Sequence, residues 1–415
     1  MLDESSIRDS ARYDMGRRSF LKAGVAIPTG LVFGKSCLAA TRPAPAKSVI
    51  LIWLWGGPSH IDTFDPKPEA PLEYRSPFPV ISTRQPGIQF SELLPKLAAR
   101  SNRFSVIRSH ATSSSNHVQA GTIGLTGHDT HLEMPQPSFG AIVGQHKRRR
   151  GSQPSFVMLG RGVPRDNQQR LSGWGGGQFG ASAGPVVASC SSDGRIEIPS
   201  TQSPIQQASW SDAHCGEPPA AEDLSHLLSE LPTESIATQD RFGRSRFGQN
   251  CLLARRLVEV GVPFIQVNWS QYADGLAPDG DPGWDMHLYN FESLQDRHGP
   301  VFDKAFSALL DDLQERGMLD STLVVAMGEF GRAPRINARA SRDDWHRCYF
   351  SLWSGGGVQP GRIIGASDRT AEEPVTPAIS PLMVGTTIAE LTGVDIHARR
   401  GLGVLSGGTV IRELL

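Results

Sequence analysis

Carboxylates and an imidazole gather within four residues of the stretch SRDDWHRCYF (341–350). Asp343 and Asp344 precede Trp345, and His346 follows it. Carboxylate and imidazole groups bind hard or borderline divalent cations, here zinc, calcium, magnesium or manganese. Such a cation needs more ligands than this stretch supplies, so other segments must contribute them. The alternative interpretation is an ordinary polar loop.

Three other segments carry the same residue types, each some way after an apolar run. The candidate ligands in them are His60 and Asp62 in GGPSHIDTFDPKP (56–68), Asp285 and His287 in GWDMH (283–287), and Glu329 in GEFGR (328–332). The spacing is not that of a linear zinc motif, so the signal lies in the recurrence of these residue types. His60 and Asp62 could instead cap a loop, and Glu329 could belong to a buried salt-bridged turn.

The apolar runs are typical of buried strands. They are SVILIWLW (48–55), FSVIRS (104–109), FVMLG (156–160), PFIQVNW (263–269), STLVVAMG (321–328) and YFSLWSGG (349–356). Helical periodicity alternates with them, for example in 240–260, 302–317 and 380–394. This alternation predicts an α/β fold with a mostly parallel central sheet and helices on both faces. Ligands bind such sheets beyond the carboxyl ends of the strands, which is where the candidate residues lie.

Composition sets the domain plan and excludes some partners. Residues 161–220 are rich in Gly, Ser and Pro, so we expect a loop-rich insertion within a single domain, 47–415. The chain has 41 basic and 42 acidic residues, a formal net charge of −1. This balance indicates neither a nucleic-acid footprint nor a polybasic membrane patch, so we expect no nucleic-acid partner.

The first 46 residues are typical of an export signal. The paired arginines of GRRSFLK (16–22) precede an apolar run (23–34) and then small residues up to Ala46. This order predicts a twin-arginine signal peptide and short linker, with the twin-arginine export machinery as a partner and a periplasmic or extracellular location. The apolar run is too short for a good membrane span, and we expect no integral span in the mature chain.

Taken in order, the motifs GGPSHIDTFDPKP, GWDMH, LVVAMGEFGRAPRIN and SRDDWHRCYF resemble those of the domain of unknown function 1501 family. That family is in turn similar to the alkaline phosphatase and sulfatase superfamily. The resemblance implies an alkaline-phosphatase-like three-layer sandwich with a divalent-metal site at the strand ends. It assigns Asp285 and His287 to the metal, Glu329 to a position where Asp is usual, and His60 or Asp62 to the first strand end.

The same resemblance implies a reaction. In that superfamily a metal-bound Ser, Thr or modified Cys attacks a phosphorus or sulfur ester, with metals acting as Lewis acids. Here His117 stands at the position of the attacking group, where it would be a phosphoryl acceptor or a ligand, and a nearby hydroxyl such as Ser115 could substitute. Arg332 or Arg342 would bind the anion, because a planar guanidinium suits tetrahedral oxyanions.

The opening stretch departs from the family pattern, which usually has Gly-Arg-Asp-His-Trp where this chain has SRDDW. Asp343 remains a candidate ligand, but Asp344 occupies the usual His position. His346 could recover the imidazole, because alternate residues of an extended chain share a side. Otherwise Asp344 is itself a ligand and favours calcium, magnesium or manganese over zinc, or the site has been lost.

These features predict an exported metal-dependent hydrolase that acts on phosphate or sulfate esters, of small molecules or of polysaccharides. The alternative is a non-catalytic envelope or carbohydrate-binding protein on the same fold. The alternative is favoured by the missing hydroxyl at the attacking position and by eight Trp residues, some of which could stack on sugars.

Overall fold

A computed structural model of the chain describes residues 44–129, 134–148, 154–167, 169–198, 221–229, 233–276 and 282–415. The chain divides after Arg42, and all described residues belong to the unit Pro43–Leu415. The predicted twin-arginine motif lies outside the described residues. None of the helices in the described ranges has the length and apolar character needed to cross a membrane.

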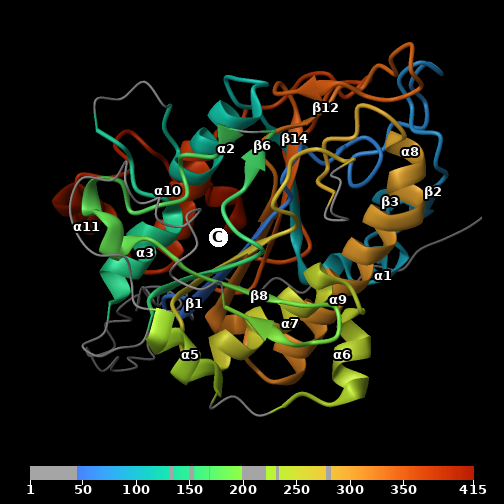
Figure 1. Cartoon of the computed structure of the whole chain (residues 1–415). Helices are drawn as coiled ribbons and strands as arrows, with labels where there is room; N and C mark the ends of the chain where they lie inside the picture. The colour runs from blue at the N-terminus through green and yellow to red at the C-terminus, as the bar shows by residue number, and fades with distance from the viewer. Residues whose placement is uncertain are drawn as a thin grey trace, which may run out of the picture. The chain divides into compact units, whose positions relative to one another are not determined.

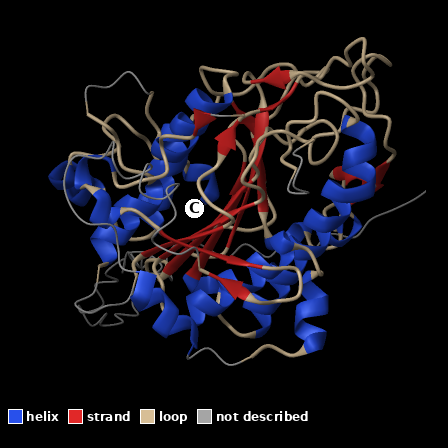
Figure 2. Ribbon diagram, viewed as in Figure 1, coloured by secondary structure: helices blue, strands red, loops and turns tan. Residues whose placement is uncertain are grey.

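A central sheet runs through this unit (Figure 2). In the described ranges its nine strands follow the order β15 (Ile363–Ile364), β4 (Ser105–His110), β14 (Tyr349–Ser354), β11 (Thr322–Met327), β1 (Ser48–Trp53), β10 (Phe264–Asn268), β5 (Phe156–Leu159), β8 (Val186–Cys190) and β9 (Ile196–Glu197). Neighbouring strands from β11 to β8 are parallel, whereas β14 and β9 run antiparallel to their neighbours. The central strands are buried along their whole length, which explains their continuous apolar sequences.

Helices cover both faces of the sheet because alternate residues of each strand face opposite sides. Ile50 and Ile52 of β1 share a core with α1 (Pro95–Ala98), α5 (Ala221–Ser229), α6 (Ile236–Phe242), α7 (Arg246–Glu259) and α9 (Gly299–Glu315). Leu51 and Trp53 share the opposite core with α2 (His117–Thr126), α3 (Phe139–Lys147) and α10 (Pro381–Leu391), against which α11 (Ile396–Leu402) packs. Figure 1 shows the two helix layers on either side of the strands. The predicted α/β three-layer sandwich is therefore confirmed.

Smaller elements lie outside the main sheet. Within the described ranges, three two-stranded ribbons pair β2 (Val80–Ser82) with β3 (Gln89–Ser91), β6 (Arg165–Asp166) with β7 (Gln169–Arg170), and β12 (Gly331–Arg332) with β13 (Asp344–Trp345). The short helix α8 (Asn290–Ser293) leads through a π-helical turn, Leu294–His298, into α9. The ribbon β12–β13 follows β11 and stands at the carboxyl end of the sheet.

One segment differs from its prediction. Residues 161–220 were expected to form loops, yet Val186–Cys190 form β8, which pairs in parallel with β5. The run VVASC is only five residues long and is preceded by Gly184 and Pro185, so its own pattern carries little strand signal. Pairing with β5 supplies the hydrogen bonds that make it a strand.

Candidate metal centre

The residues of the centre come from four separate parts of the chain. His117 is the first residue of α2, where the side chain of Asn116 caps the helix by accepting a hydrogen bond from the Gln119 amide. Asp285 lies on the loop after β10, Glu329 follows β11, and Asp344 begins β13. Because β10 and β11 are both parallel to β1, the segments that follow them leave the sheet at the same edge.

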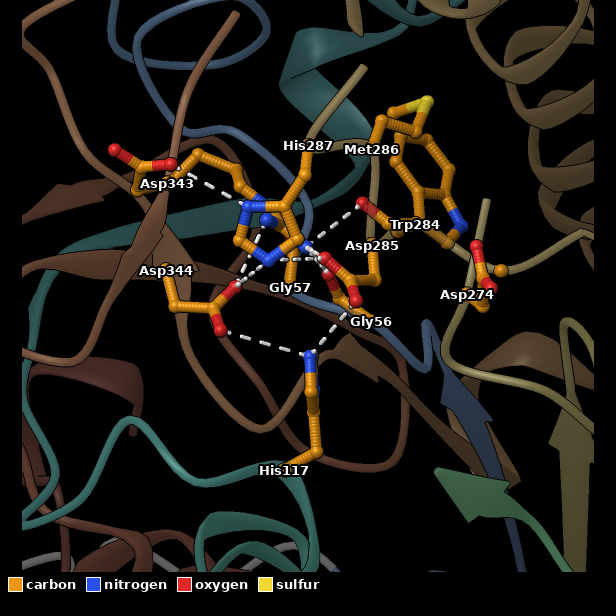
Figure 3. A network of polar contacts seen from close by, with 12 residues as sticks. Gly56, Gly57, His117, Asp274, Trp284, Asp285, Met286, His287, Asp343 and Asp344 are labelled. Atoms are coloured by element: carbon orange, nitrogen blue, oxygen red, sulfur yellow. Dashed lines mark hydrogen bonds and ion pairs between the residues drawn. The ribbon is translucent and has the colours of Figure 1, made fainter. Parts of the chain in front are cut away.

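Three side chains converge at the middle of this edge. His117, Asp285 and Asp344 each offer one ligand atom, and these atoms all lie within 4.8 Å of one another. The Nε2 atom of His117 is 3.2 Å from Asp285 Oδ2 and 3.7 Å from Asp344 Oδ2. Figure 3 shows the imidazole pointing up between the two carboxylates. One imidazole nitrogen and two carboxylate oxygens form a donor set suited to a divalent cation.

A third carboxylate orients the His117 ring. Its Nδ1 atom lies 2.8 Å from Glu329 Oε1, and the Glu329 side chain is fully buried. The Nε2 atom is also buried and makes no hydrogen bond of good geometry within the described structure. Metal-binding histidines commonly hold their other nitrogen against a carboxylate in this way, which fixes the ring and leaves the first nitrogen for the ion.

His287 repeats the arrangement from the other side. Its Nδ1 atom lies 3.4 Å from Asp343 Oδ1. Its Nε2 atom lies 3.0 Å from Asp285 Oδ1 and 3.6 Å from Asp344 Oδ1 (Figure 3). The His287 side chain is 36% exposed, against 6% for His117. The two imidazoles therefore face opposite oxygens of the same two carboxylates, and His287 is the one that solvent reaches.

Arg332 spans the two carboxylates. The Nη2 atom is 2.6 Å from Asp285 Oδ1, and Nη1 is 2.8 Å from Asp344 Oδ1. The remaining hydrogen bonds go to backbone carbonyls, with Nε donating to Gly57 O at 3.0 Å and Nη2 to Gly56 O and Trp284 O. The Arg332 side chain is fully buried. In this arrangement its N–H groups are directed at the protein.

The Gly56–Gly57 turn after β1 forms the floor beneath these side chains. The Gly56 amide donates to Glu329 Oε1 at 2.9 Å, and both carbonyls accept from Arg332. Gly56 has φ +110°, and a Cβ there would lie 2.3 Å from the Asp285 amide nitrogen. Sequence analysis did not identify this turn as part of the site. The available signal was a Gly-Gly pair directly after a buried strand, typical of close backbone approach.

The electrostatics of the centre favour a cation. Burial alone would lower the pKa of His117, but the nearby Asp285 and Glu329 carboxylates outweigh it and raise that pKa to about 10. Burial would likewise raise the pKa of Asp285, but His117 and Arg332 hold it well below its usual range. The site thus retains a proton on His117 in the presence of several carboxylates. A metal ion can replace such a proton, because ligation requires the neutral imidazole.

Several residues predicted for the site lie together, and several lie elsewhere. The network unites seven of the predicted residues: His117, Asp285, His287, Glu329, Arg332, Asp343 and Asp344. Ser115 is exposed on the loop before α2. His346 lies two residues beyond Asp344, and its backbone carbonyl accepts from the Thr112 amide at 2.9 Å. The sequence left open whether Asp344 or His346 of the stretch 341–350 belongs to the site. The network contains Asp344.

The first strand end contributes a separate buried cluster. The Nε2 atom of His60 lies 2.8 Å from Ala371 O. Asp62 is paired with Arg342, whose Nε donates to Oδ2 at 2.7 Å and whose Nη2 donates to Oδ1 at 3.0 Å. Arg342 is fully buried and also donates to Tyr74 O at 3.1 Å. This ion pair joins the loop after β1 to the segment just before β13.

Comparison with known proteins identifies a family and several similar folds. The model of a family described as "Protein of unknown function (DUF1501)" matches residues 46–211 and 224–407. No curated protein matches the sequence. Three of the similar solved structures are the lipoteichoic acid synthase LtaP from Listeria monocytogenes, the PsFucS1 sulfatase from Pseudoalteromonas sp. and the alkaline phosphatase from the Antarctic bacterium TAB5.

These structural likenesses are distant. The synthase has a TM-score of 0.42 at 10% identity, over 85% of this chain and 74% of its own. The sulfatase has a TM-score of 0.38 at 12% identity, over 85% of this chain and 69% of its own. The phosphatase has a TM-score of 0.39 at 11% identity, over 85% of this chain and 100% of its own.

Proposed function

The chain belongs to the DUF1501 family, and we propose that it is an exported metal-dependent hydrolase that cleaves phosphate or sulfate esters. The observation that carries the metal site is the convergence of His117 Nε2 with the carboxylates of Asp285 and Asp344. Each imidazole beside these carboxylates is held through its other nitrogen by a further carboxylate, Glu329 or Asp343. The ester class rests on the motif resemblance described above.

In this proposal His117, Asp285 and Asp344 hold the ion. A bound divalent ion supplies Lewis-acid polarisation of an ester oxygen and compensates the charge that develops on it. Glu329 keeps His117 in the orientation that presents Nε2. Both ring nitrogens of His117 face carboxylates, which suits a ligand better than an attacking group. We assign the attack to water or to the exposed Ser115 hydroxyl.

His287 has the position of a proton carrier. The ring lies at the exposed side of the centre, with Asp343 on Nδ1 and with Nε2 turned toward the two shared carboxylates. The hydrogen bond with Asp344 raises the pKa of His287 despite partial burial. An imidazolium held there can donate a proton to the leaving oxygen of an ester, as general acids do. The binding of the substrate anion by Arg332 or Arg342 stays a prediction. In the structure both guanidinium groups donate to acceptors of the protein itself.

Metal content and turnover test the proposal together. The mature protein, purified without chelators, should contain a divalent ion by elemental analysis. It should hydrolyse an aryl phosphate or an aryl sulfate when calcium, magnesium, manganese and zinc are tried in turn. Asp344→Asn should lose both metal and turnover, whereas the matched change His346→Gln should keep both. A protein that contains no ion and takes none up would contradict the proposal.

A second candidate function is metal-dependent binding without catalysis. It is favoured by the carboxylate contacts on both nitrogens of His117, the residue that stands where the superfamily has its attacking group. A protein that binds the ion stoichiometrically but turns over neither ester with any of the four metals would support this alternative. In that case Ser115→Ala would change neither metal content nor stability.

Export has its own test. Replacing Arg17 and Arg18 together by Lys should leave the protein in the cytoplasmic fraction, because the twin-arginine pair is the feature that predicts the export route. The matched change of Arg8 and Arg12 to Lys keeps the same charge and should leave export intact. Export of the Arg17/Arg18 variant at the normal level would count against the twin-arginine route.

A further inference from the structure

We infer that the centre holds a single divalent ion, and that the guanidinium of Arg332 occupies the place of a second cation. This inference rests on the proposed metal site and specifies its stoichiometry. It follows from how Asp285, Asp344 and their neighbours divide the four carboxylate oxygens between two sides.

The two carboxylates define two cation positions. On one side lie Asp285 Oδ2 and Asp344 Oδ2, which His117 Nε2 approaches to 3.2 and 3.7 Å. On the other side lie Asp285 Oδ1 and Asp344 Oδ1, which His287 Nε2 approaches to 3.0 and 3.6 Å. Each position thus has one imidazole nitrogen and one oxygen from each carboxylate. By donor set alone, the centre could hold a pair of ions bridged by both carboxylates.

One of these positions already holds a guanidinium, whose charge is permanent, whereas the proton on His117 at the other can be exchanged for a metal. Arg332 lies against both oxygens of the His287 side: Nη2 donates to Asp285 Oδ1 at 2.6 Å, and Nη1 forms an ion pair with Asp344 Oδ1 at 2.8 Å. On the other side, the buried Nε2 of His117 faces Asp285 Oδ2 and Asp344 Oδ2. The guanidinium therefore bridges the carboxylates as a second ion would, and the His117 side is left for the metal.

Arg332 is fixed in this place. The side chain is fully buried, and its hydrogen bonds to the carbonyls of Gly56, Gly57 and Trp284 hold the guanidinium from behind. An arginine also keeps its charge at any physiological pH, so it cannot yield by deprotonation. A metal could enter the His287 side only by displacing a buried, fully hydrogen-bonded cation.

The local charge agrees with one ion. Arg332 and one divalent ion together carry three positive charges, which match the carboxylates of Asp285, Asp344 and Glu329, while the exposed Asp343 is paired with Arg339. Replacing Arg332 by a second divalent ion would leave the same carboxylates with excess positive charge. Single-ion binding therefore leaves His287 free of metal and available to move protons.

The test is the metal stoichiometry of the full mature chain, measured by titration calorimetry and elemental analysis with manganese. The unchanged protein should bind one Mn²⁺ per chain. Arg332→Ala should open the second position and bind two, and the double change Arg332→Ala with His287→Ala should return to one. Arg342→Ala removes another fully buried arginine, paired with Asp62 away from the network, and should leave the stoichiometry at one.

Electron paramagnetic resonance of the unchanged protein with manganese distinguishes one bound ion from two. It does not depend on the folding of any variant. The expected spectrum is the six-line pattern of an isolated Mn²⁺ ion. A spin-coupled pair, or two ions per chain, would overturn this inference and leave the proposed metal site standing. A folded Arg332→Ala protein that still binds only one ion would overturn the role of Arg332. No ion in the unchanged protein would overturn the proposed function and this inference together.

Discussion

Arg332 and Asp344 lie directly opposite each other in the antiparallel ribbon β12–β13, and Arg332 Nη1 lies 2.8 Å from Asp344 Oδ1. This pairing places Asp344 beside Arg332 in the network of charged side chains at the candidate metal centre. Successive residues of a strand point to opposite faces, so the register alone selects which acidic residue faces the centre. Asp343, one residue earlier, is turned to the exposed side, where it contacts His287.

Asp344→His would install the imidazole that the motif resemblance implies at this position. The change exchanges one carboxylate for an imidazole in the set that faces His117, and softer ligands shift preference toward zinc. We expect the ratio of zinc to magnesium affinity to rise at least tenfold. Competition titrations with both ions measure this ratio. An unchanged ratio in a folded variant would show that Asp344 does not contact the ion.

Glu329→Gln tests the carboxylate that orients His117. The side chain keeps its size but loses the charge that faces Nδ1, and removing such a partner typically weakens metal binding by about 10–100-fold. Titration calorimetry should show a loss in this range. Asp343→Asn makes the matching change behind His287. Because single-ion binding leaves His287 free of metal, Asp343→Asn should change affinity less than threefold.

Gly56→Ala tests the turn beneath the site. At φ +110° a Cβ would meet the Asp285 amide nitrogen at 2.3 Å, so the backbone must move. We expect a loss of roughly 3 kcal/mol or more in the free energy of unfolding, from steric overlap added to the unfavourable φ. Gly87→Ala is the control, since it has φ +78° but meets no atom within 4 Å. It should cost only about 1–2 kcal/mol, the price of the left-handed conformation. Urea unfolding of both variants decides whether contact or conformation dominates.

Two buried histidines away from the metal centre should make stability depend on pH. Burial lowers the pKa of both His110 and His298 to about 4. The unfolded chain binds these protons near pH 6.5, so the folded state loses stability as pH falls from 6.5 toward 4. By pH 5 each histidine should cost about 2 kcal/mol relative to pH 7, at about 1.4 kcal/mol per pKa unit.

Denaturant unfolding between pH 7 and pH 5 measures this loss. His110→Gln keeps a polar group beside Ile379 O and Ser351 Oγ, which contact the histidine at 3.1 and 2.6 Å. The variant should remove the share of His110, about 2 kcal/mol between pH 7 and pH 5, whereas the shares of His298 and of buried His60, whose pKa burial also lowers, remain. A slope identical to that of the unchanged protein would show that His110 does not contribute.

The sequence by itself determined the main elements and the edge of the sheet where chemistry is placed. Continuous apolar runs such as 48–55 and 321–328 specify strands buried on both faces, and alternating helical segments then require a parallel sheet covered on both sides. Because parallel strand ends meet at one edge, Glu329 and the Asp285–His287 pair were expected near each other without any knowledge of the tertiary structure.

Only the tertiary structure decided which residues of the candidate site contact one another, and through which atoms. Sequence pattern did not distinguish Asp344 from His346, because that choice depends on the pairing of β12 with β13. Nor did it show that Glu329 and Asp343 lie behind imidazoles, or that Arg332 bridges two carboxylates. Contacts within the centre join residues up to 276 positions apart, as between Gly56 and Arg332. Local periodicity predicts where a strand lies in the sequence. Contacts between distant parts of the chain decide which atoms a side chain meets.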